Sequence, residues 1–279
     1  MKTLTQDNYY DDKDYMSVSR FKKYLECEAK TLALDTGKWV EDRDQKPLIF
    51  GNYVHSYFES AEAHRKFLEE HRSDLFSSRK PYGLLADYKL ADKVIATLET
   101  DELFNNLYHG RRGRKKDQVE KEMIVTGVIA GVPFKGKIDS INHTRGYMVD
   151  LKTMKTIYDK EWSQDLKQKV PGALANIINY NYHAQLSVYR ELLKQMTGRS
   201  YRPLIVAVSK ENEPDKEILS LDEEMLSEGL EFVSERASHV WDVATGKVGP
   251  IKCGKCDYCR SKKKLNRIVS ISELLEICN

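Results

Sequence analysis

Apolar residues recur every three or four positions through the first third of the chain, the spacing of one face of a helix. Behind a serine that can cap a helix, this spacing predicts a first helix over 17–34, which contains Cys27. It predicts a second helix over 52–71 and a third over 84–107. We therefore expect a helical N-terminal part over 17–108.

A strand pattern, in which apolar and polar residues alternate, follows the helical part. Three runs of strand length cover 119–129, 132–141 and 147–153, and segments with turn-forming glycine and asparagine separate them. Short turns between successive strands favour antiparallel pairing. We therefore expect an antiparallel meander of three strands.

Helices and strands alternate toward the C-terminus. The spacing predicts a helix over 181–197, strands over 204–208 and 217–221, and a long helix over 222–245. This order of elements favours a mixed α/β (α+β) fold with a central mixed sheet flanked by helices.

The chain has no internal repeat and no linker rich in proline or serine. We therefore interpret residues 1–279 as a single domain. Within it we distinguish the helical part 17–108, a core over 118–221, and a C-terminal helix and cysteine-containing tail over 222–279.

Composition limits the class of protein. The 45 basic and 43 acidic residues leave a net charge of +2, which argues against a histone-like protein but permits a basic groove on one face. No apolar run approaches the length of a membrane span, and the polar, acidic N-terminus is unlike a secretory signal. We therefore expect a cytoplasmic protein, in which the five cysteines do not form a disulfide framework.

Acidic and basic residues meet in the predicted meander. Asp150 and Lys152 project from one face of their strand about 7 Å apart, and the hairpin brings Asp139 close to Asp150. Two carboxylates provide the oxygen ligands that Mg²⁺ or Mn²⁺ prefers, and the lysine can orient a water or stabilise charge on a phosphate. The alternative is a surface ion pair between Asp139 and Lys152, with Asp150 capping a turn.

Two further motifs flank this cluster in the sequence. The motifs are, in order, Gly51-Asn-Tyr-Val-His55, Gly-Lys-Ile-Asp139 followed ten residues later by Asp150-Leu-Lys152-Thr, and Gln185-Leu-Ser-Val-Tyr189. The set resembles the PD-(D/E)XK nuclease superfamily, in particular its RecB-like and RecE-like exonuclease branch. The resemblance spans about residues 17–264 and implies a restriction-endonuclease-like core.

The resemblance implies a role for each residue of the central motif. Asp139 and Asp150 would bind a metal ion, together with His55 and the backbone carbonyl of Leu151. Lys152 would be the catalytic lysine beside the attacking water. For His55 the alternative is an ordinary helix histidine without a ligand.

The last motif places Gln185 and Tyr189 on one face of a helix. The resemblance implies that they contact the DNA backbone or brace the catalytic lysine, and the alternative is half-buried packing. Glu120 and Glu122 share one face of their strand and offer a further carboxylate to the site.

Three of the cysteines, Cys253, Cys256 and Cys259, are separated by two residues each, which is typical of a metal site. A fourth ligand would be Cys27 or Cys278. In AddB-like and CRISPR-associated relatives, one cysteine of the first helix and three near the C-terminus hold a [4Fe–4S] cluster, and Cys27 resembles the first of these. The last gap is shorter here than in those relatives, which leaves structural Zn²⁺ or no metal as alternatives.

A basic loop follows the helical part. It contains Arg111, Arg112, Arg114, Lys115 and Lys116, and a second basic group over 260–264 follows the cysteines. Such groups suit a DNA backbone, because each phosphate that they bind releases condensed counterions. The alternative is a loop that is basic only for solubility.

The resemblance and the residues together predict a Mg²⁺-dependent DNA exonuclease of phage or mobile-element recombination. Relatives of this type form rings and work beside a single-strand annealing protein, in the cytosol of bacteria or of phage-infected cells. The sequence contains no P-loop, so we do not expect the chain to drive strand separation. The alternatives are a CRISPR-adaptation or helicase-associated nuclease of the same fold, which the cysteines favour, and a non-catalytic nucleic-acid-binding module.

Overall fold

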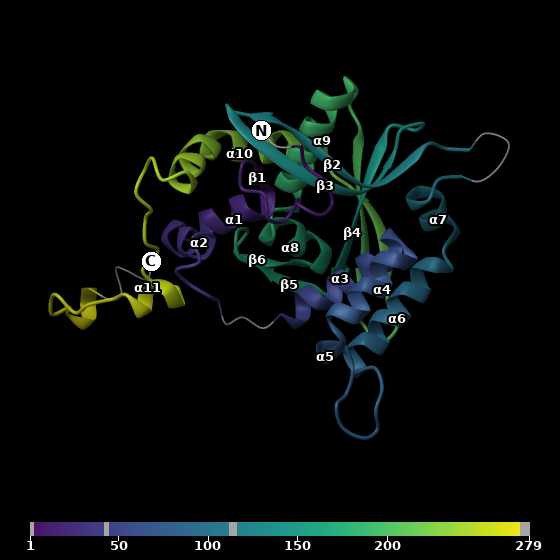
Figure 1. The fold of residues 1–279 in the computed structure, drawn as a ribbon, viewed down its shortest axis with the longest axis horizontal. Helices are drawn as coiled ribbons and strands as arrows, with labels where there is room; N and C mark the ends of the chain where they lie inside the picture. The colour runs from purple at the N-terminus through teal and green to yellow at the C-terminus, as the bar shows by residue number, and fades with distance from the viewer. Residues whose placement is uncertain (1–2, 42–44, 112–115, 274–279) are drawn as a thin grey trace. The chain divides into compact units, whose positions relative to one another are not determined.

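The computed structural model describes residues 3–41, 45–111 and 116–273 of the chain (Figure 1). The chain forms two compact units, each made of segments that are distant in sequence. Unit 1 comprises Met1–Val18 and Arg43–Ser238, and unit 2 comprises Ser19–Asp42 and His239–Asn279. The interpretation of the whole chain as one domain stays a prediction.

Within the described residues, unit 1 contains a six-stranded mixed sheet (Figure 1). Its strands are β1 (Met16–Ser17), β2 (Val119–Ile129), β3 (Val132–Asn142), β4 (Tyr147–Met154), β7 (Arg202–Ser209) and β8 (Lys216–Ser220). Strands β2, β3 and β4 pair antiparallel, which confirms the predicted meander. Strand β7 pairs parallel with β4 and antiparallel with β8, which confirms a mixed sheet.

Strands β3 and β4 separate within the sheet. In the part of the chain that the structure describes, they pair from Ser140 with Val149 to Asn142 with Tyr147. On the same edge of β3, β1 pairs farther back, at Phe134 and Lys135. The stretch of β3 between these two pairings therefore has room on this edge for side chains.

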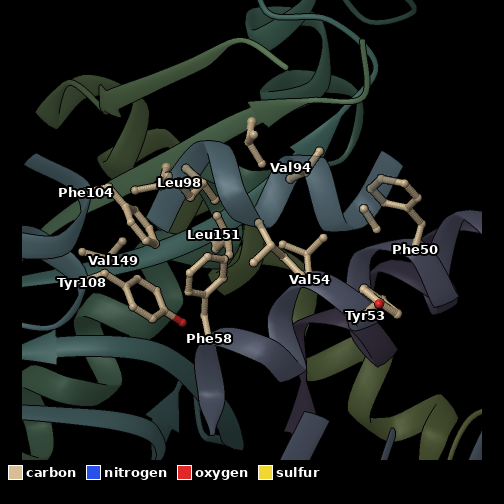
Figure 2. Packing of buried hydrophobic residues seen from close by; sticks show 14 of the residues in the cluster. Phe50, Tyr53, Val54, Phe58, Val94, Leu98, Phe104, Tyr108, Val149 and Leu151 are labelled. Atoms are coloured by element: carbon tan, nitrogen blue, oxygen red, sulfur yellow. The ribbon is translucent and has the colours of Figure 1, made fainter. Parts of the chain in front are cut away.

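Five helices form the helical part of unit 1. They are α3 (Lys46–Glu59), α4 (Ala61–Glu70), α5 (Arg72–Leu75), α6 (Ala86–Glu99) and α7 (Glu102–Tyr108), all within the described ranges. Alternate residues of β4 and β7, among them Val149, Leu151 and Val206, pack against these helices in one hydrophobic core (Figure 2). Burial of a side chain of this size contributes about 1.5–3 kcal/mol. The core therefore holds α3 and β4 firmly beside each other.

Two helices and a small hairpin accompany the sheet. Helix α9 (Tyr182–Thr197) packs on β2 and β3 and confirms the helix predicted over 181–197. Helix α8 (Gly172–Asn179) packs on the hairpin of β5 (Lys160–Ser163) and β6 (Gln168–Pro171). The sequence did not predict these three short elements, because the strands are mostly exposed and lack a clear alternation. The predicted long helix is confirmed as α10 (Glu223–Ala244).

Each of the three predicted N-terminal helices is broken into shorter helices. The breaks lie at Cys27, Ser60 and Asp101, and each of these side chains accepts a hydrogen bond from the backbone N–H three residues later. Apolar spacing continues across such a break, while the capping side chain starts a new helix. The sequence predicted that Cys27 lies inside a helix, and this prediction is wrong: Cys27 caps the start of α2.

Unit 2 contains α1 (Val18–Glu26) from Ser19 on, α2 (Glu28–Asp35), the end of α10 from His239 on, and α11 (Asp257–Ser261). Its two segments are joined at Glu28, whose carboxylate lies 2.8 Å from His239 Nε2 and accepts a 2.8 Å hydrogen bond from the backbone N–H of Ile251. Among the described residues, none of the helices is long and apolar enough to cross a membrane.

Candidate active site

Asp139 lies at the point where β3 leaves β4. Its register continues the pairing of Ser140 with Val149, so it faces Asp150 across the gap. The Asp139 carboxylate accepts a 2.7 Å hydrogen bond from the backbone N–H of Leu151. Burial, and then the charge of Asp150, raise the pKa of Asp139 to about 7. The backbone of β4 thus fixes this buried carboxylate.

Asp150 and Lys152 project from β4 on the face opposite the hydrophobic core, as strand alternation predicts. Asp150 is 2% exposed, and its Oδ2 lies 2.5 Å from Lys152 Nζ. Burial alone would lower the pKa of Lys152, but the carboxylates of Asp150 and Asp139 raise it above its ordinary value. The lysine therefore remains an ammonium ion between two acidic groups.

His55 reaches the same site from α3, one turn after Gly51. Its Nδ1 lies 3.4 Å from Asp139 Oδ2, and 28% of its side chain remains exposed. Burial, and then the nearby charge of Lys152, lower the pKa of His55. The ring is therefore neutral near pH 7, the form in which histidine binds a metal ion.

Gln185 and Tyr189 meet the site from α9. Gln185 Nε2 lies 3.5 Å from Asp150 Oδ1 and donates to the hydroxyl of Tyr189 at 3.3 Å. Gln185 thus contacts Asp150. The resemblance implied that Gln185 contacts the DNA backbone or braces Lys152. Lys152 instead lies over the ring of Tyr182, with its Nζ 5.1 Å from the ring centre.

Sequence reasoning missed the importance of Gly136 and Tyr182. A β-carbon at Gly136 would lie 2.5 Å from the Tyr189 ring, so the glycine permits α9 to approach β3. Its position within the Gly-Lys-Ile-Asp139 motif was the available signal. For Tyr182 the sequence offered only its place one turn before Gln185 on the same helix.

Glu122 also belongs to this group, whereas Glu120 does not. Glu122 is 8% exposed and pairs with Lys137 at 2.9 Å, while Glu120 lies 3.3 Å from His143 at an exposed position. Glu122 adopts a left-handed backbone conformation with φ of 52°, which interrupts strand alternation at this point. Burial, and then Asp139, raise the pKa of Glu122 to about 7.

These residues fit a divalent cation. Asp150 Oδ2 is buried, and among the described residues no group donates a well-directed hydrogen bond to it, although Lys152 lies close. Asp139 supplies a second carboxylate and His55 a neutral ring, within 3.4 Å of each other. Oxygen-rich sites with few protein ligands are typical of Mg²⁺. The backbone N–H of Leu151 donates to Asp139, while the side chain of Leu151 is in the core.

The four predicted cysteine ligands lie together in unit 2. The Sγ atoms of Cys27, Cys253, Cys256 and Cys259 are all within 4.8 Å of one another, so they form a group that can hold a metal. Cys278 lies outside the described residues.

The basic loop, defined as Arg111, Arg112, Arg114, Lys115 and Lys116, is described only at its ends. Arg111 and Lys116 are exposed, and the other three residues lie outside the described ranges. Asp117 anchors the end of the loop by accepting hydrogen bonds from the backbone of Arg111 and from Asn142. The Arg111 N–H, followed by Asn142, lowers the pKa of Asp117.

Known proteins resemble this chain in fold and in sequence. Residues 17–262 match the family described as a PDDEXK-like domain of unknown function (DUF3799). The crystal structure of a candidate exonuclease from Eubacterium rectale is 30% identical and superposes with a TM-score of 0.83, over 98% of this chain and 98% of that chain. The crystal structure of SSO0001 is 13% identical with a TM-score of 0.28, over 86% of this chain and 91% of that one, a likeness too weak to be informative. A search of curated proteins finds no match.

Proposed function

The chain belongs to the family of PDDEXK-like domains, and from this membership we propose that it is a metal-dependent nuclease that hydrolyses phosphodiester bonds in DNA. The family and the mixed sheet flanked by helices agree with the superfamily that the motifs resemble. The observation that carries the proposal is the convergence of Asp139, Asp150 and Lys152, from two strands, with His55 from a helix. A binding module without catalysis has no need for this buried, charged group.

Asp139, Asp150, His55 and the carbonyl of Leu151 would hold Mg²⁺ or Mn²⁺. The bound ion would supply Lewis acidity toward a phosphate oxygen. Gln185 holds Asp150 from the side, and Tyr189 supports Gln185. The Asp139 carboxylate is kept in place by the Leu151 N–H. The chain thus orients its acidic ligands before the substrate arrives.

Lys152 acts on the substrate as a cation. Its carboxylate neighbours raise its pKa, so it stays protonated and is better suited to orient the attacking water and stabilise phosphate charge than to accept a proton. The ring of Tyr182 limits the movement of the Lys152 ammonium group on one side. The basic loop would bind the DNA backbone without reading its sequence.

The narrower assignment is an exonuclease of phage or mobile-element recombination. The likeness to the Eubacterium rectale protein, a candidate exonuclease, favours action at DNA ends. A ring-shaped oligomer and a single-strand annealing partner would accompany this role. A helicase-associated nuclease is the second candidate, because the AddB-like relatives also bring one cysteine of the first helix together with three near the C-terminus.

The test compares linear with covalently closed circular double-stranded DNA, incubated with the purified chain and Mg²⁺ or Mn²⁺. We expect loss of the linear DNA only, and a decrease of about 10²–10³-fold or more in Lys152→Ala. Lys155→Ala is the matched control, because Lys155 directly follows β4 but is 83% exposed and pairs with Glu161. Both variants are checked for wild-type thermal unfolding.

Each outcome has a clear meaning. An inactive wild-type chain with either metal refutes the nuclease proposal. Cleavage of the closed circle refutes the exonuclease assignment alone. Wild-type activity in Lys152→Ala shows that hydrolysis occurs elsewhere.

A further inference from the structure

The four cysteines of unit 2 come from opposite ends of the chain and meet at short distances. The Sγ of Cys27 lies 3.6 Å from that of Cys259 and 3.7 Å from that of Cys256, and Cys253 Sγ lies 3.9 Å from Cys259 Sγ. All four sulfurs are within 4.8 Å of one another. The separation of the sulfurs distinguishes the two kinds of metal group that four thiolates commonly hold.

A single tetrahedral ion keeps its ligands close together. Four sulfurs bound to Zn²⁺ at about 2.3 Å occupy the corners of a tetrahedron with edges of about 3.8 Å. In a [4Fe–4S] cluster each thiolate binds a different iron and lies outside a cube, so the sulfurs are roughly 6 Å or more apart. The observed distances match the first arrangement and are too short for the second.

The backbone around the cysteines is arranged for one small ion. The N–H groups of Lys30, Cys256 and Cys259 point at the sulfurs of Cys27, Cys253 and Cys256, at 3.4 to 3.5 Å. Gly254 adopts a φ of 77°, which lets the chain turn tightly between the first two cysteines of the tail. Donors directed at sulfur stabilise thiolates in the charged form that binds metal.

The cysteines also form part of a hydrophobic cluster in unit 2. Cys27, Ala29 and Cys259 form one buried cluster, against which Cys253, Cys256 and Tyr258 pack. Tyr258 also contacts the ring of Trp39 edge-on, with 5.5 Å between ring centres. Few large apolar side chains take part in this cluster, so the region around the cysteines needs another source of stability.

From these observations we propose that Cys27, Cys253, Cys256 and Cys259 bind one Zn²⁺, in a closed structural site that joins the two segments of unit 2. The [4Fe–4S] cluster that the resemblance implies does not fit the sulfur distances. Four thiolates leave no open position for a substrate, so the ion is structural. The proposal is independent of the nuclease activity, because it concerns other residues and another metal.

The first experiment measures metal in the full chain, purified without oxygen from cells supplied with both iron and zinc. We expect one zinc per chain, little iron and no absorption band near 400 nm. Replacing the metal by Co²⁺ should give the intense visible spectrum of a tetrahedral thiolate site. Four irons per chain with a brown colour, or disulfides without metal, would overturn the proposal.

The second experiment uses cysteine variants. Cys259→Ser should lose the zinc and expose the tail to proteolysis, while Cys278→Ser serves as the matched control and should keep one zinc per chain. If Cys259→Ser fails to fold, removal of zinc from the wild-type chain with a chelator gives the same test: proteolysis should begin within unit 2 and cease when Zn²⁺ is restored. Unchanged zinc content in Cys259→Ser would contradict the assignment.

Discussion

Replacing Gly136 by alanine tests the packing that holds Tyr189 and Gln185 at Asp150. A β-carbon at Gly136 would lie 2.5 Å from Tyr189 Cε1 and 3.2 Å from a methyl group of Val125. Tyr189 is only 9% exposed, so its ring has little room to move. The substitution must therefore displace the ring, or α9 with it, away from β3.

The free energy of this displacement follows from two opposing effects. Overpacking a buried contact costs about 1–3 kcal/mol, and restricting the unfolded chain with alanine returns about 0.4–1 kcal/mol. We expect a net loss of about 1–2 kcal/mol, which lowers the melting temperature by roughly 2–8 °C in a chain of this size. Nuclease activity should fall as well, because Gln185 loses its support beside Asp150.

Gly51→Ala is the matched control, since it also changes a motif glycine. Its β-carbon would lie 3.7 Å from Thr153 Oγ1, an ordinary contact, and alanine favours a helix over glycine by about 1 kcal/mol. The two substitutions should therefore change stability in opposite directions.

Thermal and urea unfolding of both variants, and of Gly136→Ala combined with Tyr189→Ala, provide the assay. Removal of the ring should relieve the clash, so the double variant should be more stable than the sum of the single changes by about 0.5–3 kcal/mol. The reasoning is refuted if Gly136→Ala is as stable as the wild type, or if the two changes are additive.

Two further predictions concern the acidic group and the basic loop. Above pH 7, where Glu122 is ionised, Glu122→Gln should raise the Mg²⁺ concentration needed for half-maximal activity, because it removes a buried negative charge beside Asp139. Glu120→Gln, at an exposed position, should not change it, and equal Mg²⁺ titrations of the two variants would contradict this. Replacing the basic loop by alanines should weaken DNA binding and reduce the slope of log K against log salt by about 0.9 for each phosphate that the loop no longer neutralises, measured by fluorescence anisotropy. An unchanged slope would mean that the loop does not bind phosphates.

Strand patterns in this sequence were more informative than helix patterns. The ranges 119–129, 132–141 and 147–153 match β2, β3 and β4 to within one residue. The helical spacing found the right segments but missed the breaks at Ser60 and Asp101, because apolar residues keep facing the same core on both sides of a cap. Each break between two helices depends on one hydrogen bond to a capping side chain, and the spacing of apolar residues does not reveal such a bond.

The candidate site was predictable where it depends on local geometry. Alternation placed Asp150 and Lys152 on one face, and the hairpin register placed Asp139 opposite Asp150. Contacts between distant elements were not predictable, since nothing in the spacing of α9 shows that Tyr182 lies against Lys152. The left-handed backbone at Glu122 is likewise set by tertiary packing, and it decides which of two glutamates reaches the site.

The spacing of the cysteines predicted which residues lie together but not which metal they bind. It identified the four cysteines that lie together, but four such thiolates can bind either one ion or a cube of four irons. The last gap, shorter than in the iron–sulfur relatives, has a structural meaning: Cys256 caps α11 and Cys259 lies one turn later, with its N–H 3.4 Å from Cys256 Sγ. This spacing does not by itself distinguish the two, because gaps of two residues also separate cysteines that hold [4Fe–4S] clusters. The short distances between the sulfurs are therefore the observation that favours a single ion.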